Sequence, residues 1–415
     1  MPDQGDDFGE MNTLGSLANS GISGGLGGSG SGGGFGSGRG TGSGFGLGMG
    51  TGKLFGLIPE TMRKRCSKDD RLQRLKENGG TPACEEAVLK ALRWLKANQQ
   101  ADGSWGGGNK PAMTGLALLA YFGHCETPVS EEFGDSCLKG IVYLVDIGLR
   151  NNGRIASDFA SNHWPYEHAI ATYALAEALT FCRELKVDVP HLENVTQKAG
   201  QFIIENQNRN GGWSYLYAKS DGHVDLSVTG WQIQALKACS HRSVLFSGMT
   251  TSITKALKYT NSCQHDSGGF GYTGKDPAGG VGYHTLTGVG MLCNQMWDKG
   301  NTRDIRKAAD YVIANTRFDY NSEFSDLYGH YYESQAMMQF GGEHWAKYNA
   351  LFRDQLLNNQ EADGSWKQPG GGRQIRGVAT EYFANPVYRT ALCALMLEVY
   401  YRFLSTGGST RRSGI

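Results

Sequence analysis

The sequence predicts an all-α fold, an (α/α)6 toroid in which six helical hairpins form two concentric layers behind a disordered Gly-rich N-terminal tail. Three observations support this prediction. A short motif recurs along the chain, polar-faced amphipathic segments alternate with apolar segments rich in small residues, and glycine is concentrated in the first 53 residues. A motif that returns at long intervals is typical of repeat architectures.

The recurring motif consists of a glutamine, three residues, a glycine, one residue and a large aromatic residue. Its four glutamines are separated by 108, 57 and 96 residues, so two of the intervals span about two units of roughly 50 residues. Degenerate copies of the turn are expected near 150–154 and 315–321, which makes six units. The four clear copies are Gln99–Trp105, Gln207–Trp213, Gln264–Phe270 and Gln360–Trp366.

The Gln–Gly–aromatic motif is expected to be structural rather than catalytic. Its glycine supplies backbone angles that other residues avoid, and Asp-Gly or Asn-Gly pairs favour tight turns. The glutamine amide can bond backbone groups that a helix end leaves unpaired. The aromatic side chain can pack back over that helix end.

Each motif is preceded by an amphipathic helix, as in 87–95, and followed by a more uniformly apolar one. Helices that are apolar all round are covered on both sides, so the second helices should form the inner layer. These inner helices are expected near 114–122, 168–181, 227–239, 285–296, 333–340 and 388–403.

The chain divides into four parts. Residues 1–53 hold 21 of the 61 glycines and cannot bury enough apolar surface to offset the cost of ordering, which predicts a disordered segment that serves as a flexible tether or an interaction tail. Residues 54–80 are expected to be a basic lead-in segment whose short helix is either solvated or lies on a membrane surface. The toroid should span 81–405, because Thr81-Pro82 has the features of a helix start. Residues 406–415 form a flexible C-terminus.

Composition excludes several classes of protein. The 40 basic and 40 acidic residues cancel, which argues against a nucleic-acid partner. No stretch approaches 18 apolar residues, so no transmembrane segment is expected, and no signal peptide is recognisable. The nine cysteines are odd in number and lack a CxxC pair, which favours buried free thiols in a reducing, cytoplasmic compartment.

The four motifs resemble the QW-type repeats of the terpene cyclase and protein prenyltransferase superfamily, which includes squalene–hopene cyclases. The resemblance covers about residues 82–404, and the segment 385–403 is also similar to the closing helix of bacterial terpene cyclase/mutase-like proteins. It implies a central, aromatic-lined, apolar cavity that holds isoprenoid chains and opens where the inner helices begin.

Class II cyclases in this superfamily protonate their substrate with a DxDD motif at the start of an inner helix. The corresponding stretch here, His223–Trp231, keeps only Asp225, with His223 and Leu226 in place of the flanking acids. Three roles stay open for Asp225: it caps the inner helix, it is a catalytic acid, or it contacts a ligand.

The resemblance to prenyltransferases implies a zinc site made by an Asp-x-Cys pair and a later histidine. Tyr283–Gly290 resembles the histidine-bearing segment, but no Asp-x-Cys pair occurs. Lanthipeptide cyclases, which are also toroids, bind zinc with two cysteines and a histidine. Cys239, Cys293 and His284 offer these residue types, but their separation in the sequence makes the signal weak. We therefore expect no metal and no other cofactor, and His284 is interpreted as a polar residue at a helix start.

Polar and aromatic residues gather at the predicted starts of the inner helices, and a closed ring would bring them to one opening. In a cyclase, Asp225 would donate the proton, Glu167, His168 or Glu333 would assist it, and tyrosines would stabilise cations. The expected ligand-binding residues are Trp164, Tyr166, His168, His223, Tyr283, His284, Tyr331, Tyr332 and Tyr388.

The leading interpretation is a toroid that binds a small hydrophobic, isoprenoid-type ligand in its central cavity, with a terpene cyclase or mutase, an isomerase, as the nearest enzyme class. The alternative is a non-catalytic binding or scaffold toroid tethered by its tail, which the missing acids favour. A third class, a polysaccharide-active enzyme, would need paired carboxylates such as Glu167 and Glu333. No protein partner of the tail is identified.

Overall fold

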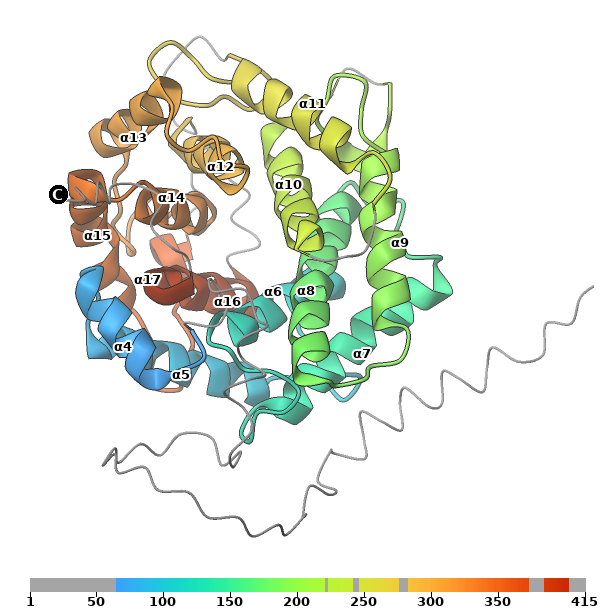
Figure 1. Ribbon diagram of the computed structural model, residues 1–415. Helices are drawn as coiled ribbons and strands as arrows, with labels where there is room; N and C mark the ends of the chain where they lie inside the picture. Colours follow the sequence, from blue (N-terminus) through green and yellow to red (C-terminus); the bar gives the residue numbers. More distant parts are fainter. Residues whose placement is uncertain (1–64, 221–222, 242–245, 276–282, 373–383, 403–415) are drawn as a thin grey trace, which may run out of the picture.

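The structure is a computed structural model that describes residues 65–220, 223–241, 246–275, 283–372 and 384–402. Twelve helices of this part alternate between an outer and an inner layer (Figure 1). The outer helices are α5 (Pro82–Ala97), α7 (Gly134–Arg150), α9 (Leu192–Glu205), α11 (Met249–Ser262), α13 (Arg303–Asn315) and α15 (Gly342–Leu357). The inner helices are α6 (Lys110–Gly123), α8 (Trp164–Leu185), α10 (Leu226–Ser240), α12 (Tyr283–Met296), α14 (Leu327–Phe340) and α16 (Pro386–Leu397).

The inner helices form a closed ring. Each packs against the next one along the chain, and α16 packs against both α5 and α6. The predicted (α/α)6 toroid is therefore confirmed, and isolated β-bridges are the only β structure among the described residues. The expected degenerate turns near 150–154 and 315–321 are the connections from α7 to α8 and from α13 to α14.

The two layers differ in burial as the hydrophobic pattern predicts. In α6 every residue from Pro111 to Gly123 is buried, whereas α5 buries a single face. Close approach of neighbouring inner helices depends on small residues. A Cβ on Gly115 of α6 would lie 2.8 Å from the Cγ2 atom of Ile170 in α8.

The glutamine of the motif connects neighbouring outer helices. The Gln99 amide donates to the carbonyl of the motif glycine at 2.9 Å and to the Ser136 carbonyl in α7 at 3.0 Å. The second and third motifs make the same pair of bonds to α11 and α13. Gln360, after the last outer helix, donates to the Ala87 carbonyl in the first one at 2.8 Å. This bond joins the two ends of the outer layer.

The glycine and the aromatic residue of the motif are also structural. Gly364 has a φ of +97°, and a Cβ on it would lie 2.3 Å from the Lys90 carbonyl oxygen of α5. The indole N–H of Trp366 donates to the Leu356 carbonyl near the end of the preceding helix at 2.8 Å, as the other two motif tryptophans do in their units. The motif thus both turns the chain and fixes the next outer helix.

The lead-in helix, α4 (Lys68–Glu77), exposes most of its residues, as expected of a solvated helix, and packs one face on the toroid. It packs against α5 and against α17 (Val399–Arg402), and it buries Arg71 and Leu75. Asn78, which follows it, donates to the Tyr400 carbonyl at 3.1 Å and accepts from the Trp345 indole at 2.8 Å. The helix is held because both its apolar and its basic side chains find buried partners.

Two of the nine cysteines are not free thiols. Cys66 and Cys125 form a disulfide, and the other seven cysteines are buried and not disulfide-bonded. The expectation of free thiols is therefore wrong for this pair, which lies 59 residues apart in sequence and meets only through the fold. Disulfides persist mainly in oxidising compartments, which weighs against the reducing, cytoplasmic location; that location stays a prediction.

Two further expectations concern the ends of the chain and the membrane. The tail 1–53 and the C-terminus 406–415 lie outside the described residues. Within the part that is described, no helix has both the length and the apolar character that crossing a membrane requires.

A Gly364→Ala substitution tests the close approach in the motif. We expect it to lower the free energy of unfolding by roughly 1–3 kcal/mol, because the new Cβ meets a backbone carbonyl in a left-handed conformation. Gly107→Ala is the control, since nothing lies within 4 Å of a Cβ there. Urea unfolding of both variants measures the difference, and equal stabilities would contradict the proposed role of the motif.

Candidate ligand-binding site

The starts of three inner helices meet around Ser227, in the first turn of α10. The Tyr166 hydroxyl, from the start of α8, lies 2.6 Å from the Ser227 Oγ atom. The Tyr328 hydroxyl, from the start of α14, donates to the Ser227 carbonyl at 3.4 Å. Burial raises the pKa of Tyr328, and the neighbouring Tyr388, at the start of α16, raises it further. Residues remote in sequence are thus brought to one end of the ring.

Two more tyrosines complete this end, and their hydroxyls bond one another. Tyr215 and Tyr272 follow the aromatic residue of the second and third motifs by two positions, and their hydroxyl oxygens lie 2.8 Å apart. His223 stacks on Tyr215, with ring centroids 5.5 Å apart. We call the five tyrosines the tyrosine rim: Tyr166, Tyr215, Tyr272, Tyr328 and Tyr388.

Asp225 lies beneath the tyrosine rim as the N-cap of α10. Its Oδ1 atom accepts from the Val228 N–H at 2.8 Å and from the Ser227 hydroxyl at 2.6 Å. Its Oδ2 atom accepts from the Tyr272 hydroxyl at 3.4 Å. Burial raises the pKa of this carboxyl, and the bonds from Ser227 and Val228 oppose the rise. Of the three roles left open for Asp225, helix capping is the one that the geometry shows.

The rim is aromatic and carries little charge among its described residues. Tyr272 is 37% exposed, and Leu216, which follows Tyr215 in the chain, is 46% exposed at a φ of +58°. Burial first and the Asp225 charge second raise the pKa of Tyr166, so its hydroxyl stays protonated. The Arg389 side chain donates to the carbonyls of Trp366 and Ala384.

Trp164 and His168, two predicted ligand-binding residues, face the outer layer instead. The Trp164 ring packs against Phe202 of α9. The His168 ring accepts from the Ile155 N–H at 3.1 Å and donates to the Ala199 carbonyl at 3.2 Å, which fixes the neutral tautomer. Burial lowers the pKa of His168 to about 3. Both ring nitrogens are therefore occupied by the protein.

Glu167 and Glu333, the predicted assisting acids, do not meet Asp225 or each other. Each one bonds the loop that precedes its own inner helix. The Glu167 Oε2 atom accepts from the N–H and the hydroxyl of Ser157, at 3.0 and 2.8 Å. The Glu333 Oε1 atom accepts from the Thr316 hydroxyl at 3.0 Å. These two loops are the degenerate turns, so the two buried glutamates hold the connections that lack the motif.

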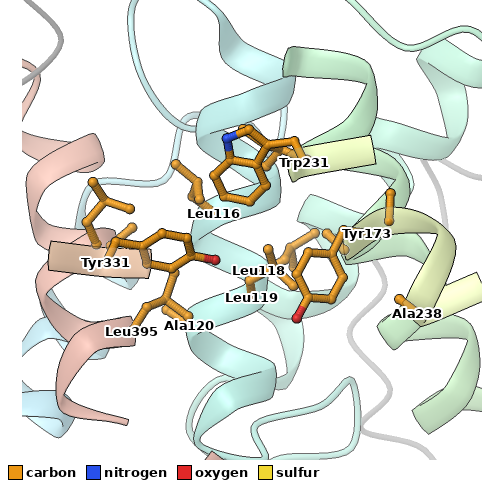
Figure 2. Packing of buried hydrophobic residues seen from close by; sticks show 14 of the residues in the cluster. Leu116, Leu118, Leu119, Ala120, Tyr173, Trp231, Ala238, Tyr331 and Leu395 are labelled. Atoms are coloured by element: carbon orange, nitrogen blue, oxygen red, sulfur yellow. The ribbon is translucent and has the colours of Figure 1, made fainter. Parts of the chain in front are cut away.

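Tyr331 and Tyr332, also predicted to bind a ligand, belong to the buried centre of the ring. Tyr331 stacks on Trp231 of α10 with centroids 5.5 Å apart, and both residues are 1% exposed. The Tyr332 hydroxyl accepts from the Gln234 amide at 3.0 Å. Figure 2 shows Trp231 and Tyr331 beside the leucines of α6, with Tyr173 of α8 on the other side. These aromatic side chains act as core.

The remaining predicted ligand-binding residues either lie at the tyrosine rim or have side chains that the structure does not describe. Tyr166, Tyr388 and the exposed His223 lie at the rim. The α12 helix begins at Tyr283, but the side chains of Tyr283 and His284 are outside what the structure describes. Among the described residues, no group of three or more His, Cys, Asp or Glu side chains is placed to hold a metal ion.

Sequence reasoning missed Tyr215, Tyr272, Ser227 and Tyr328. A signal for the first two was present, because Gly-Gly-Trp-Ser-Tyr and Gly-Gly-Phe-Gly-Tyr place a tyrosine at the same offset in two motifs. Tyr328 stands in the first turn of α14, as Tyr166 and Tyr388 do in α8 and α16. Ser227 carried no signal, since its role depends on the capped geometry of Asp225.

Comparison with known proteins supports the fold. The chain matches no protein-family model and no curated protein. Among solved structures it is similar to an inactive variant of the alpha-1,6-mannanase GH76A of Salegentibacter sp. HEL1_6 in complex with alpha-1,6-mannotetrose, with a TM-score of 0.54, 11% identity, and coverage of 77% of this chain and 98% of that chain. A type II terpene cyclase from Scytonema, in complex with geranylgeranyl dihydroxybenzoate, aligns with a TM-score of 0.48 and 10% identity over 78% of this chain and 99% of that chain.

These likenesses define the class of protein by its fold alone. The chain is an (α/α)6 toroid by the packing of its own helices, and the mannanase shares this architecture. At 10–11% identity the shared architecture does not carry an activity from either enzyme to this chain.

The pH dependence of stability tests the assignment of His168 as a neutral core residue. Between its ordinary pKa of 6.5 and the folded value of about 3, the unfolded chain takes up a proton at this position and the folded chain does not. The free energy of unfolding should therefore decrease as the pH is lowered through this window, by up to about 1.36 kcal/mol per pH unit.

His168→Gln should remove that part of the slope, because glutamine can keep a donor and an acceptor without titrating. Urea unfolding at several pH values between about 7 and 4 gives the slopes. His223→Gln, at an exposed position, is the control. Equal slopes in the wild type and His168→Gln would show that His168 is charged in the fold.

The capping role of Asp225 predicts a graded response to substitution. Asp225→Ala removes the acceptor for the Val228 N–H and should lower the free energy of unfolding by about 1–2 kcal/mol. Asp225→Asn keeps an acceptor oxygen and should lose less. Thermal and urea unfolding without any ligand measure both variants. If Asp225→Ala is as stable as the wild type, Asp225 is placed there for a ligand and not for the helix.

Proposed function

We propose that the chain is a non-catalytic binding toroid that holds a small hydrophobic ligand against the tyrosine rim. The observation that carries this proposal is the convergence of five tyrosines from distant parts of the chain over a single carboxylate that already caps a helix. Tyrosine offers a large apolar ring with one polar end, which suits it to contact a mostly apolar ligand at a partly wet surface.

The rim is preferred to the ring centre as the place of contact. Trp231 and Tyr331 at the centre are almost fully buried by their neighbours, whereas Tyr272 and Leu216 keep more than a third of their surface exposed. The apolar ligand would cover this exposed surface. An isoprenoid chain is the first ligand class to test, because the motifs resemble those of the terpene cyclase and prenyltransferase superfamily.

The absence of a catalytic role rests on how the acids are engaged. A general acid needs a proton that faces the substrate. Glu167 and Glu333 bond loops between the two layers, and both oxygens of Asp225 accept bonds from neighbouring groups.

An acid-catalysed cyclase or mutase is the second candidate, and one observation favours it. Burial raises the pKa of Asp225, which favours its protonated form beneath a ring of aromatic side chains. A cation formed there would lie near tyrosine rings. In this case Asp225 would be the proton donor.

Ligand binding is tested by mass spectrometry of lipids extracted from the purified protein and by titration with a fluorescent geranylgeraniol analogue. The double variant Tyr215→Ala/Tyr272→Ala should weaken binding about tenfold or more, since it removes the exposed aromatic surface. Phe324→Ala, at an exposed aromatic residue that is not part of the rim, is the control. Binding that is absent in the wild type, or equal in all three proteins, would refute the proposal.

Catalysis is tested in the same preparations by incubation with squalene and with polyprenyl diphosphates. We expect neither substrate to be consumed by the wild type or by Asp225→Asn. Consumption by the wild type that is lost in Asp225→Asn would instead establish the second candidate.

A further inference from the structure

The end of the toroid opposite to the tyrosine rim carries a buried charged cluster. Glu177 lies three turns beyond Tyr166 along α8, about 16 Å further on at the rise of an α-helix. It accepts from Arg65 at 3.2 Å and from Arg402 at 3.2 Å. We call Arg65, Glu177, Glu398 and Arg402 the floor cluster, and we call residues 65–78, which include α4, the strap.

The strap inserts a charged side chain into this floor. Arg65 is 2% exposed, and its guanidinium also lies 5.4 Å from the centroid of the Phe181 ring. Burial lowers the pKa of Arg65 in spite of the nearby glutamate. Burying an ion pair costs desolvation that its attraction barely repays. The insertion of Arg65 is therefore a weak attachment unless another bond holds it in place.

The two carboxylates that receive the strap arginines each have a second basic partner on the toroid itself. Glu177 is shared by Arg65 and Arg402. Glu85 of α5 accepts from Arg71 of the strap at 2.8 Å and from the His124 ring at 3.1 Å. Departure of the strap would leave neither carboxylate buried without a partner, which removes the usual penalty for breaking a buried pair.

The covalent link holds the N-terminal end of the strap, where the Arg65 carbonyl also accepts from the Arg71 guanidinium at 2.8 Å. Cys66 follows Arg65, is partly exposed, and is bonded to Cys125. Cys125 stands just after the C-cap of α6 with a φ of +69°, where glycine is the usual residue. A cysteine in this conformation is explained by its bond to the strap. The other end is tied by the hydrogen bonds of Asn78 to Tyr400 and Trp345.

We propose that the strap is a redox-latched cover over the floor of the toroid, fixed in place by the Cys66–Cys125 bond and released at its N-terminal end when that bond is reduced. A dithiol reductant transfers two electrons and two protons. The S–S bond breaks, two thiols form on the protein, and the dithiol becomes a disulfide. Arg65 then separates from Glu177, which stays paired with Arg402. The N-terminal end of the strap moves away from the floor, and Asn78 acts as the hinge.

Hydrogen–deuterium exchange of the full chain, with and without dithiothreitol, tests the latch. Reduction should speed the exchange of amides in 66–72 roughly tenfold and leave α8, α10 and α14 unchanged. Cys66→Ser should show the fast exchange without reductant and should not respond to dithiothreitol. Cys125→Gly is the second variant, because glycine suits the φ at this position and keeps the turn intact. Cys137→Ala, at a free buried cysteine, is the control.

Three results would overturn the proposal. Alkylation of Cys66 and Cys125 in the unreduced protein would show that the bond does not form. Unchanged exchange after reduction would show that the other contacts suffice to hold the strap. Faster exchange throughout the toroid would show that the bond supports the whole fold instead of a local cover. None of these measurements uses a ligand, so their outcome is separate from that of the lipid-binding test.

Discussion

The closed ring depends on a repeated hydrogen bond between neighbouring outer helices. Four glutamine amides each join a turn of one unit to a carbonyl in the first or second turn of the next outer helix, and the fourth joins the last unit to the first. The bond fixes four of the six outer helices beside their neighbours, and the junctions after α7 and α13 lack the motif. The inner helices, which are buried on almost all sides, can then pack only toward the common axis. A ring of this kind brings their first turns together, and the tyrosine rim is the result.

The predicted part of the fold is the part that this motif and the hydrophobic pattern encode. Helical spacing located the inner helices, and the long intervals located the two units without a motif. The way these two units are held was not predictable from local pattern. Glu167 and Glu333 stand in inner helices, where a buried carboxyl is a natural candidate for chemistry. They act instead on the preceding loops, and only the packed structure shows that those loops need acceptors.

The sequence predicted the end of the ring at which the candidate site lies, but only some of the residues that form it. A closed ring correctly placed Tyr166, His223, Asp225 and Tyr388 at one end. It could not tell which residues of a first turn face the axis and which face the outer layer, because a helix turns by about 100° per residue. Trp164 and His168 lie two residues on either side of Tyr166 and point to α9. Tyr331 and Tyr332 lie one turn deeper than Tyr328 and are buried by Trp231.

The two ends of the ring differ in chemistry because the ends of a helix differ. At the rim, the first turns expose N–H groups, and Asp225 satisfies one of them. At the floor, the last turns expose carbonyls, and Arg402 donates to one of them, the Leu119 carbonyl, at 3.3 Å. Basic side chains are therefore expected at the floor, and each needs a carboxylate when it is buried. The strap arginine enters a cluster that already satisfies this requirement with Arg402 and Glu177. The floor accommodates the strap without depending on it, which leaves the rim and the ring intact whether the strap is bound or released.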